Sequence, residues 1–442
     1  MTPPSAPDLS IPQSLVGQPF GAFGPDVRPV ASDAVRTPLV VILLTSAMLA
    51  NSAVLIFKAD RTFMLANQYL TWLIFGGTLI LASRRPWLAP LKSPIRTSLT
   101  FVVIGLIAST FMVLRAGLRT DGNQLVLQAA ALAFLTFPFF AMDTAAKAAD
   151  VDRSVLITCH FILILSMISI VGDFTGSTNY ESGAGRYFGF LGDAAAWALS
   201  LPLLVYFCRG KFVLATIAGL ALVLTASRGP AFVVAMAMLF LLGFGRGRRI
   251  QYAATFVVMG LVALYQSNLF STLAGRISAT QLSSNDRITT AIAGLQLFAK
   301  SPVFGSGYNT LTYHFPTVWR RTLHGLLPNQ TSTFVQMLSD GGLMMFIPFI
   351  LFVIFCTVAG ISLMKRSRGM MSAGTMHGVI SWLLAMLWMN QSAAWFFVGS
   401  YVGPLVVGMA GCVSGYWARV RFAERVAPTH FQGAPASATA PQ

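Results

Sequence analysis

Long apolar runs recur along most of the chain, and the polar and charged residues gather in the shorter stretches between them. Each run is about 20 residues long, the length that an α-helix needs to cross the hydrocarbon core of a bilayer. Only 10% of the residues are charged and 55% are hydrophobic, whereas a soluble domain carries about 25% charged residues. The pattern therefore predicts an all-α, polytopic membrane protein.

The apolar runs predict about 12 transmembrane helices. They cover residues 38–57, 65–83, 97–114, 124–142, 154–172, 189–208, 212–227, 229–245, 251–267, 342–364, 373–390 and 394–417. Residues 1–36 and 421–442 are rich in Pro, Gly or Ala and contain no apolar core, so we expect disordered tails on either side of a membrane domain at 37–420. One connection, residues 267–333 between the ninth and tenth spans, is long enough to form a large loop.

The basic residues predict the orientation of the chain. With the N-terminus in the cytoplasm, 19 of the 30 Lys and Arg residues fall on the inner side and 11 on the outer side, as the positive-inside rule requires. We therefore expect both termini in the cytoplasm and the large loop on the outer side of the membrane. The same distribution accounts for the net charge of +16 without a nucleic-acid partner.

The outer side nevertheless holds a cluster of cations. Seven of its 11 basic residues lie between Arg186 and Arg321, although insertion disfavours positive charge there. An anionic ligand would offset this cost, and Arg side chains bind phosphates in bidentate fashion. The candidate phosphate-binding residues are Arg186, Arg228, Arg276, Arg287, Arg320 and Arg321.

Simpler roles exist for some of these residues. Arg186 could anchor the chain at the membrane interface, and Arg228 could lie at a helix C-terminus and face the helix dipole. His324, also in the large loop, is a candidate general base because histidine titrates near neutral pH. No nucleotide-binding or metalloprotease motif is present, and we expect neither a cofactor nor a metal.

The large loop contains one predicted helix. Ser284-Asn285-Asp286 is typical of a helix start, and apolar residues then repeat at helical spacing from Ile288 to Phe298. We expect this amphipathic helix to lie on the membrane surface or on the bundle. Ser301-Pro302 should end it, and Gly305-Ser306-Gly307 should form a tight turn.

Four stretches resemble the superfamily of bacterial O-antigen ligases and O-antigen polymerases. They are Gly185–Phe190, Leu224–Gly229, Asn285–Arg287 with the helix that continues to Ser301–Asn309, and Phe334–Leu343. Their order, their spacing and the single large outer loop between the ninth and tenth spans carry the resemblance, which covers residues 38–420.

The resemblance implies a metal-independent, inverting membrane glycosyltransferase. Such an enzyme takes a glycan from undecaprenyl pyrophosphate and transfers it to a sugar hydroxyl on another glycan or on lipid A–core. Arg186 and Arg287, with Arg228 and Arg276 in support, would then stabilise the pyrophosphate that leaves. A chain-length regulator protein is a possible partner.

The chain departs from the ligases of this superfamily at one place. Where those carry a His-Asn pair before the tenth span, this chain has Thr331-Ser332. The base is then His324, or an acid such as Glu181 or Asp286, or no strong base is needed. The missing pair favours a polymerase of capsule, exopolysaccharide or O-antigen repeat units. A ligase is the alternative, and a flippase or exporter of lipid-linked glycans is a more distant one.

Overall fold

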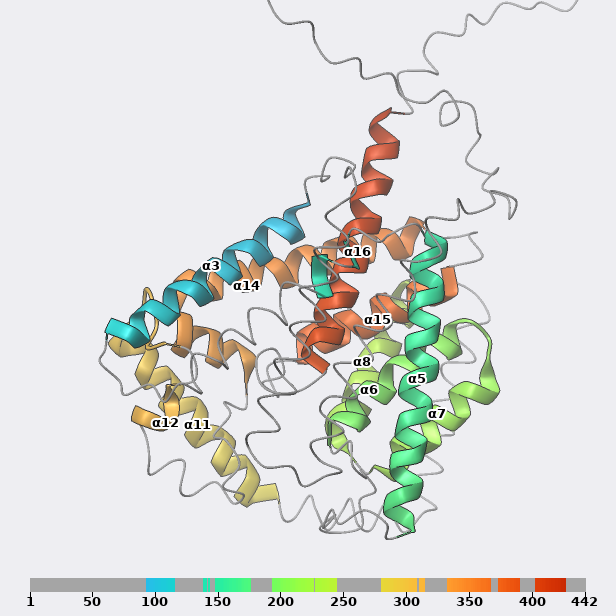
Figure 1. Ribbon diagram of the computed structural model, residues 1–442, viewed down its shortest axis with the longest axis horizontal. Coiled ribbons are helices and arrows are strands. Elements are labelled where there is room, and N and C mark those ends of the chain that lie inside the picture. The colour runs from blue at the N-terminus through green and yellow to red at the C-terminus, as the bar shows by residue number, and fades with distance from the viewer. Residues whose placement is uncertain are drawn as a thin grey trace, which may run out of the picture.

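The computed structural model describes residues 93–115, 138–140, 142–143, 148–175, 193–225, 227–244, 280–307, 310–314, 332–366, 373–389 and 402–426. Within this part of the chain, every regular element is an α-helix (Figure 1). The predicted spans at 38–57, 65–83 and 251–267, most of the span at 124–142, and the N-terminal tail lie outside the described residues.

The described helices are α3 (Pro94–Arg115), α5 (Ala148–Phe174), α6 (Asp193–Cys208), α7 (Phe212–Leu224), α8 (Arg228–Phe244), α11 (Thr280–Lys300), α12 (Leu311–His314), α14 (Thr333–Arg366), α15 (Ala373–Met389) and α16 (Val402–Val426). Helices α11 and α12 lie within the predicted large loop, and the other eight overlap predicted spans and agree with them to within a few residues at most ends. The largest differences are at α14, which begins nine residues before the predicted span at 342–364, and at α16.

The helices form two groups (Figure 1), and contacts among α14, α15 and α16 connect one group to the other. In one group α14 packs along α3, and α11 packs on α14 with α12 beside it. In the other group α6 is central and contacts α5, α7, α8 and α15. The largest fully buried side chains include Trp382, Tyr206, Phe349 and Phe352, so the core runs through both groups.

The helices are apolar on their exposed faces as well as on their buried ones. Phe111, Phe174, Val213 and Phe232 are each more than 60% exposed, and a helix that is hydrophobic all round is typical of a membrane span. By length and composition, Val155–Phe174 and Thr333–Arg366 can each cross a membrane. The remaining apolar helices among the described residues are shorter.

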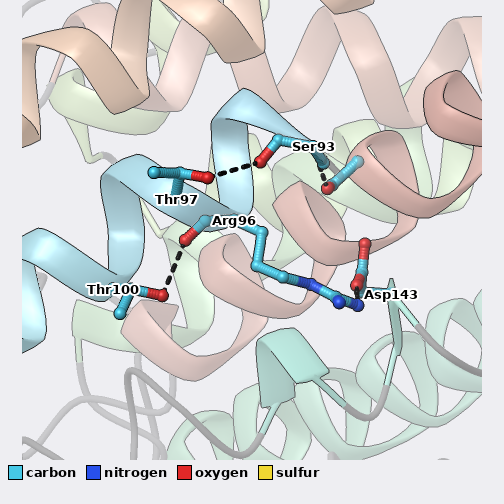
Figure 2. Close-up of polar contacts among 6 residues, drawn as sticks. Ser93, Arg96, Thr97, Thr100 and Asp143 are labelled. Carbon is cyan, nitrogen blue, oxygen red and sulfur yellow. Dashed lines mark hydrogen bonds and ion pairs between the residues drawn. The ribbon is translucent and has the colours of Figure 1, made fainter. Parts of the chain in front are cut away.

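An ion pair and a close helix contact attach α3 and α16 to residues 138–143. Arg96 of α3 donates to the carboxylate of Asp143 (Figure 2), and its guanidinium lies 5.7 Å from the centre of the Phe140 ring. Gly415 of α16 packs against the backbone of Asp143, where a Cβ atom would lie 2.4 Å from the carbonyl oxygen. The Ser93 and Ser414 hydroxyls are 2.8 Å apart, so the start of α3 is also fixed to α16.

A second ion pair connects three helices of the other group. Arg209 Nη1, directly after α6, donates to both carboxylate oxygens of Asp152 on α5 at 2.8 and 2.7 Å. The same nitrogen donates to Thr375 Oγ1 on α15 at 2.6 Å. These contacts hold the end of α6 to the first turns of α5 and α15.

The prediction of a disordered tail from residue 421 is wrong for its first six residues, because α16 continues to Val426 (Figure 1). The Arg421 guanidinium stacks over the Trp417 ring at 4.8 Å, one helical turn earlier. Arg and Glu are good helix formers, so the helix extends beyond its apolar part. The end of an apolar run therefore marked the end of the predicted span but not the end of the helix.

Candidate functional site

The site region centres on a break in α14. Gly342 has φ 60° and ψ −159°, which no helix contains, so α14 consists of two helices that meet at this residue. We call the first of them, Thr333–Gly341, the half-helix. The second, Leu343–Arg366, is 24 residues long and rises about 36 Å, enough to span a bilayer. The predicted start of the tenth span at residue 342 coincides with this break, although α14 itself begins at Thr333.

The turn at residues 301–307 binds this break through backbone hydrogen bonds on both sides of Gly342. Four such bonds join the turn to α14, each with an N···O distance of 2.8–3.1 Å: Ser306 N to Ser339 O, Gly307 N to Asp340 O, Leu343 N to Pro302 O and Met344 N to Val303 O. Because the break removes intrahelical hydrogen bonds, the turn satisfies backbone groups of α14 that would otherwise stay unpaired. We call this arrangement the turn–kink interlock.

Two glycines make the close approach possible. A Cβ atom on Gly305, where φ is +71°, would lie 2.4 Å from the backbone of Asp340. A Cβ atom on Gly342 would lie 2.5 Å from the carbonyl oxygen of Val303. Both glycines have a positive φ, which other residues adopt at a cost, and neither site has room for a side chain.

Replacing Gly305 with Ala should open the interlock. The positive φ alone costs about 1–2 kcal/mol, and the forced backbone displacement adds about 1–3 kcal/mol. Gly210→Ala is a matched control because Gly210 has φ +74° and nothing within 4 Å of a Cβ atom. Thermal unfolding of the detergent-purified protein should show a much larger loss of stability for Gly305→Ala. Equal losses would mean that the interlock does not stabilise the fold.

A connected set of buried polar groups lies at the interlock. The Ser306 hydroxyl donates to the Ser339 carbonyl at 2.9 Å and lies 3.0 Å from Thr310 Oγ1. The Ser339 hydroxyl donates to Asp340 Oδ1 at 3.0 Å. Ser339 and Asp340 are almost completely buried, and so is Gln336, one helical turn before them. One face of the half-helix is therefore polar and buried.

The other face of the half-helix is apolar and fixes it to the core. The Phe334 ring packs edge-on against Phe349 at 5.6 Å and against Phe346 at 6.4 Å. Met337 is buried in the core cluster. The half-helix thus packs against the second part of α14 on one side and against the 301–307 turn on the other.

Helix α11 leads directly into the 301–307 turn. It begins at Thr280, so the predicted start at Ser284-Asn285-Asp286 is wrong: these residues lie inside the helix. Ser and Asn cost only a few tenths of a kcal/mol more than Leu or Gln in a helix interior, and their preference for caps did not stop the preceding turn from being helical. The predicted end before Ser301-Pro302 is confirmed.

The apolar stripe of α11 is not its buried face. Ile292 and Leu295 are 50% and 47% exposed, whereas Ala293 and Leu297 are buried and pack with Leu311 of α12. The face of α11 that carries Ala293 and Leu297 is therefore its buried face, and Ile292 and Leu295 of the predicted stripe are left exposed. This arrangement suits a helix at a membrane surface.

The beginnings of α6 and α8 lie together. Helix α7 ends at Leu224 and α8 begins at Arg228, within a few residues of the predicted spans at 212–227 and 229–245. The C-cap of α7 is Thr225, so the interpretation of Arg228 as a C-terminal residue is wrong. Gly229 packs directly on the ring of Trp197 in the first turns of α6, and a Cβ atom there would lie 2.1 Å from the ring.

The structure places two of the candidate arginines through their backbones. Arg228 is the first residue of α8, and Arg287 lies in the third turn of α11. Asp286 precedes it in the same helix. The other candidates lie outside the described residues: Arg186, Arg276, Arg320, Arg321, His324 and Glu181. Their roles remain predictions.

His314 ends α12. Partial burial of the ring and, to a lesser degree, the charge of Lys300 lower the pKa of His314 below its ordinary value. The imidazole is therefore neutral at neutral pH, the form that can accept a proton. His314 is the second histidine of the large loop and the natural comparison for His324.

Residues 212–350 match the family model described as O-antigen ligase. No curated protein matches the chain. The matched segment contains α7, α8, α11, the 301–307 turn and the half-helix, and it includes three of the four stretches that carry the resemblance. The resemblance to the O-antigen ligase and polymerase superfamily is thereby confirmed over this segment, and the two long apolar helices among the described residues fit a protein of the membrane.

Sequence reasoning quoted the residues of the interlock but assigned no function to them. Neither Gln336 nor Ser306 was among the predicted site residues. One signal was available: Ser332, Gln336, Ser339 and Asp340 recur at helical spacing at the start of an otherwise apolar segment. Polar residues at that spacing form one face of a helix, and in a membrane protein such a face must meet partners.

Proposed function

We propose that this protein polymerises oligosaccharide repeat units carried on undecaprenyl pyrophosphate, at the periplasmic face of the bacterial inner membrane. The observation that carries the proposal is the O-antigen ligase match over residues 212–350, which contains Arg228, Arg276, Arg287, Arg320, Arg321 and His324. The periplasmic placement rests on the charge distribution of the sequence.

The proposed reaction is one displacement at an anomeric carbon. The oxygen of an acceptor hydroxyl forms a bond to the anomeric carbon of the donor sugar from the side opposite the leaving group. The bond from that carbon to the pyrophosphate oxygen breaks, the pyrophosphate takes the electron pair, and the configuration inverts. The hydroxyl proton passes to a general base, which we assign to His324.

The arginines act on the leaving group. Negative charge grows on the pyrophosphate as the bond breaks, and guanidinium groups already in place stabilise it most effectively. We assign this role to Arg186 and Arg287, with Arg228, Arg276, Arg320 and Arg321 completing the phosphate-binding surface. Such a site needs no metal ion, because the arginines supply the positive charge.

The turn–kink interlock supports the assignment of Arg287. The hydrogen bonds that join the 301–307 turn to α14 also fix the end of α11, and Arg287 lies on that helix. A catalytic group contributes most when its supporting structure is rigid. The interlock therefore gives α11 a defined position beside a membrane-spanning helix.

A polymerase and a ligase share the donor and differ in the acceptor. Thr331-Ser332, in place of the His-Asn pair of the ligases, favours the polymerase. A ligase that transfers the glycan to lipid A–core is the second candidate, which the description of the matching family favours. A chain-length regulator would be a partner of the polymerase.

A strain that lacks the gene tests the proposal. Its lipid-linked glycans and its surface polysaccharide are extracted and sized together. We expect single repeat units to accumulate on undecaprenyl pyrophosphate and the polymer to disappear, with recovery when the wild-type gene is returned.

Two other outcomes would contradict the polymerase in different ways. Full-length polymer stranded on the lipid carrier, with unmodified lipid A–core, would identify a ligase. Glycan trapped on the cytoplasmic side would identify a flippase or exporter and exclude both enzymes.

A further inference from the structure

Gln336 carries an unused hydrogen-bond acceptor in the half-helix. Its side chain is 2% exposed, and its Oε1 atom has no hydrogen-bond partner among the described residues. Within the part of residues 212–350 that the structure describes, no other buried side-chain oxygen or nitrogen lacks a partner. A buried amide oxygen without a partner lowers stability, so its presence calls for an explanation.

The surrounding polar groups do not need this oxygen. Ser339 donates to Asp340, and Ser306 donates to the Ser339 carbonyl. The Gln336 backbone N–H donates to the Ser332 carbonyl at 2.9 Å, and its own carbonyl lies 3.2 Å from the Ser339 hydroxyl. The hydrogen bonds of the interlock are thus made by other groups, and none of them involves the side-chain oxygen of Gln336.

The position of Gln336 allows a ligand to reach it. Ser332 lies one helical turn earlier, about 5.4 Å along the axis, and its side chain is partly exposed. The Gln side chain has three rotatable bonds, and turning Oε1 toward Ser332 breaks no hydrogen bond at that atom. A hydroxyl group at the beginning of the half-helix could therefore donate to Gln336 Oε1 without entering the core.

We infer that Gln336 Oε1 binds a hydroxyl group of the acceptor sugar. A carboxamide oxygen is a neutral acceptor, which suits a sugar hydroxyl and gives no attraction to a pyrophosphate. The phosphate-binding arginines would hold the donor, and Gln336 would orient the acceptor from the half-helix. This inference rests on the proposed glycosyl transfer, but it holds equally for a repeat unit and for lipid A–core as the acceptor.

The test compares Gln336→Leu with the wild-type protein in detergent or lipid nanodiscs. The donor is the lipid-linked repeat unit that accumulates in the deletion strain. The acceptor probe is the same oligosaccharide freed from its lipid by mild acid, which has no pyrophosphate and can act only as acceptor. We expect the KM for this probe to rise about 3- to 10-fold, as for the loss of one hydrogen bond, while the KM for the donor changes less than twofold.

Stability provides the second readout. Leu has nearly the volume of Gln and removes a buried oxygen without a partner, so Gln336→Leu should unfold at the same temperature as the wild-type protein or at a higher one. A structural role predicts the opposite sign. Ser339→Ala is the matched control: it removes a hydroxyl that donates to Asp340, and should lower the unfolding temperature while the KM for the acceptor probe stays within twofold.

Two results would overturn the inference. One is an unchanged KM for the acceptor probe, and the other is a destabilised Gln336→Leu protein in which both KM values rise together. If the wild-type protein glycosylates lipid A–core and not the repeat unit, the polymerase proposal fails, and the titration with lipid A–core as acceptor then tests Gln336 by the same criteria. A deletion strain that traps glycan on the cytoplasmic side overturns both.

Discussion

Arg287→Ala should reduce polymer formation about 10²- to 10³-fold, the usual effect of removing one group that stabilises charge in the transition state. Arg287 is fixed on α11, which the turn–kink interlock joins to α14. Its loss should act on kcat as well as on donor binding, because negative charge on the pyrophosphate grows as the glycosyl bond breaks. The measurement is the rate of elongation of the lipid-linked repeat unit by purified protein.

Two further variants distinguish the effect of losing the Arg287 side chain from a general effect of mutating α11. Arg287→Lys keeps the positive charge but loses the bidentate geometry, so its activity should fall between those of the wild-type protein and the Ala variant. Gln296→Ala changes an exposed residue on the same helix and should leave the rate unchanged. Normal polymer length with Arg287→Ala, at normal protein levels in the membrane, would remove Arg287 from the site.

His324→Ala should lower the rate about 10²- to 10⁴-fold, the range typical of removing a general base. The acceptor hydroxyl must lose its proton as it attacks the donor sugar, and this chain lacks the His-Asn pair that ligases carry at Thr331-Ser332. The effect should appear in kcat, with little change in the KM of the donor. Single-turnover rates with saturating donor and acceptor give the cleanest measure.

His314→Ala is the matched comparison for His324→Ala, because both histidines lie in the large loop. His314 is neutral at neutral pH, since partial burial and Lys300 lower its pKa, and so it could also accept a proton. We expect its Ala variant to keep activity within a few-fold of the wild-type protein. The reverse result, with His314 essential and His324 replaceable, would show that the base was assigned wrongly.

The sequence was sufficient to predict most of the described helices. Spans such as 212–227 and 373–390 coincide with α7 and α15, because apolar runs of this length have few alternatives to helix in a bilayer. The helix boundaries were predicted wrongly where the helix continues outside an apolar run. The start of α11 at Thr280 precedes a Ser-Asn-Asp sequence that resembles a cap, and α16 continues through charged residues to Val426.

The turn–kink interlock could not be predicted in the same way. Its two parts, residues 301–307 and 339–344, are more than 30 residues apart, and backbone hydrogen bonds join them. Contacts between backbone atoms affect the sequence only where they require a glycine, as they do at Gly305 and Gly342. A single glycine also fits a turn or a helix end. The sequence alone therefore does not show that these two segments contact each other.

The candidate site residues likewise divide into those that the sequence suggests and one that only the structure reveals. Residue type and predicted outer location are the grounds on which the arginines and His324 are candidates, because phosphate binding and proton transfer need those side chains. Gln336 was not identified, since an amide near the start of an apolar helix is unremarkable until its burial and its missing partner are known. Burial at a single position depends on the packing of other helices, which periodicity does not report.

Elongation by the purified protein tests the central claim most directly. Wild-type protein in lipid nanodiscs is given only the undecaprenyl-pyrophosphate-linked repeat unit, with EDTA present, and the products are separated by size. We predict a ladder of lipid-linked glycans that grows by one repeat unit at a time and matches the ladder formed without EDTA. No elongation from active, folded protein, together with transfer of preformed glycan to lipid A–core, would contradict the account and identify a ligase.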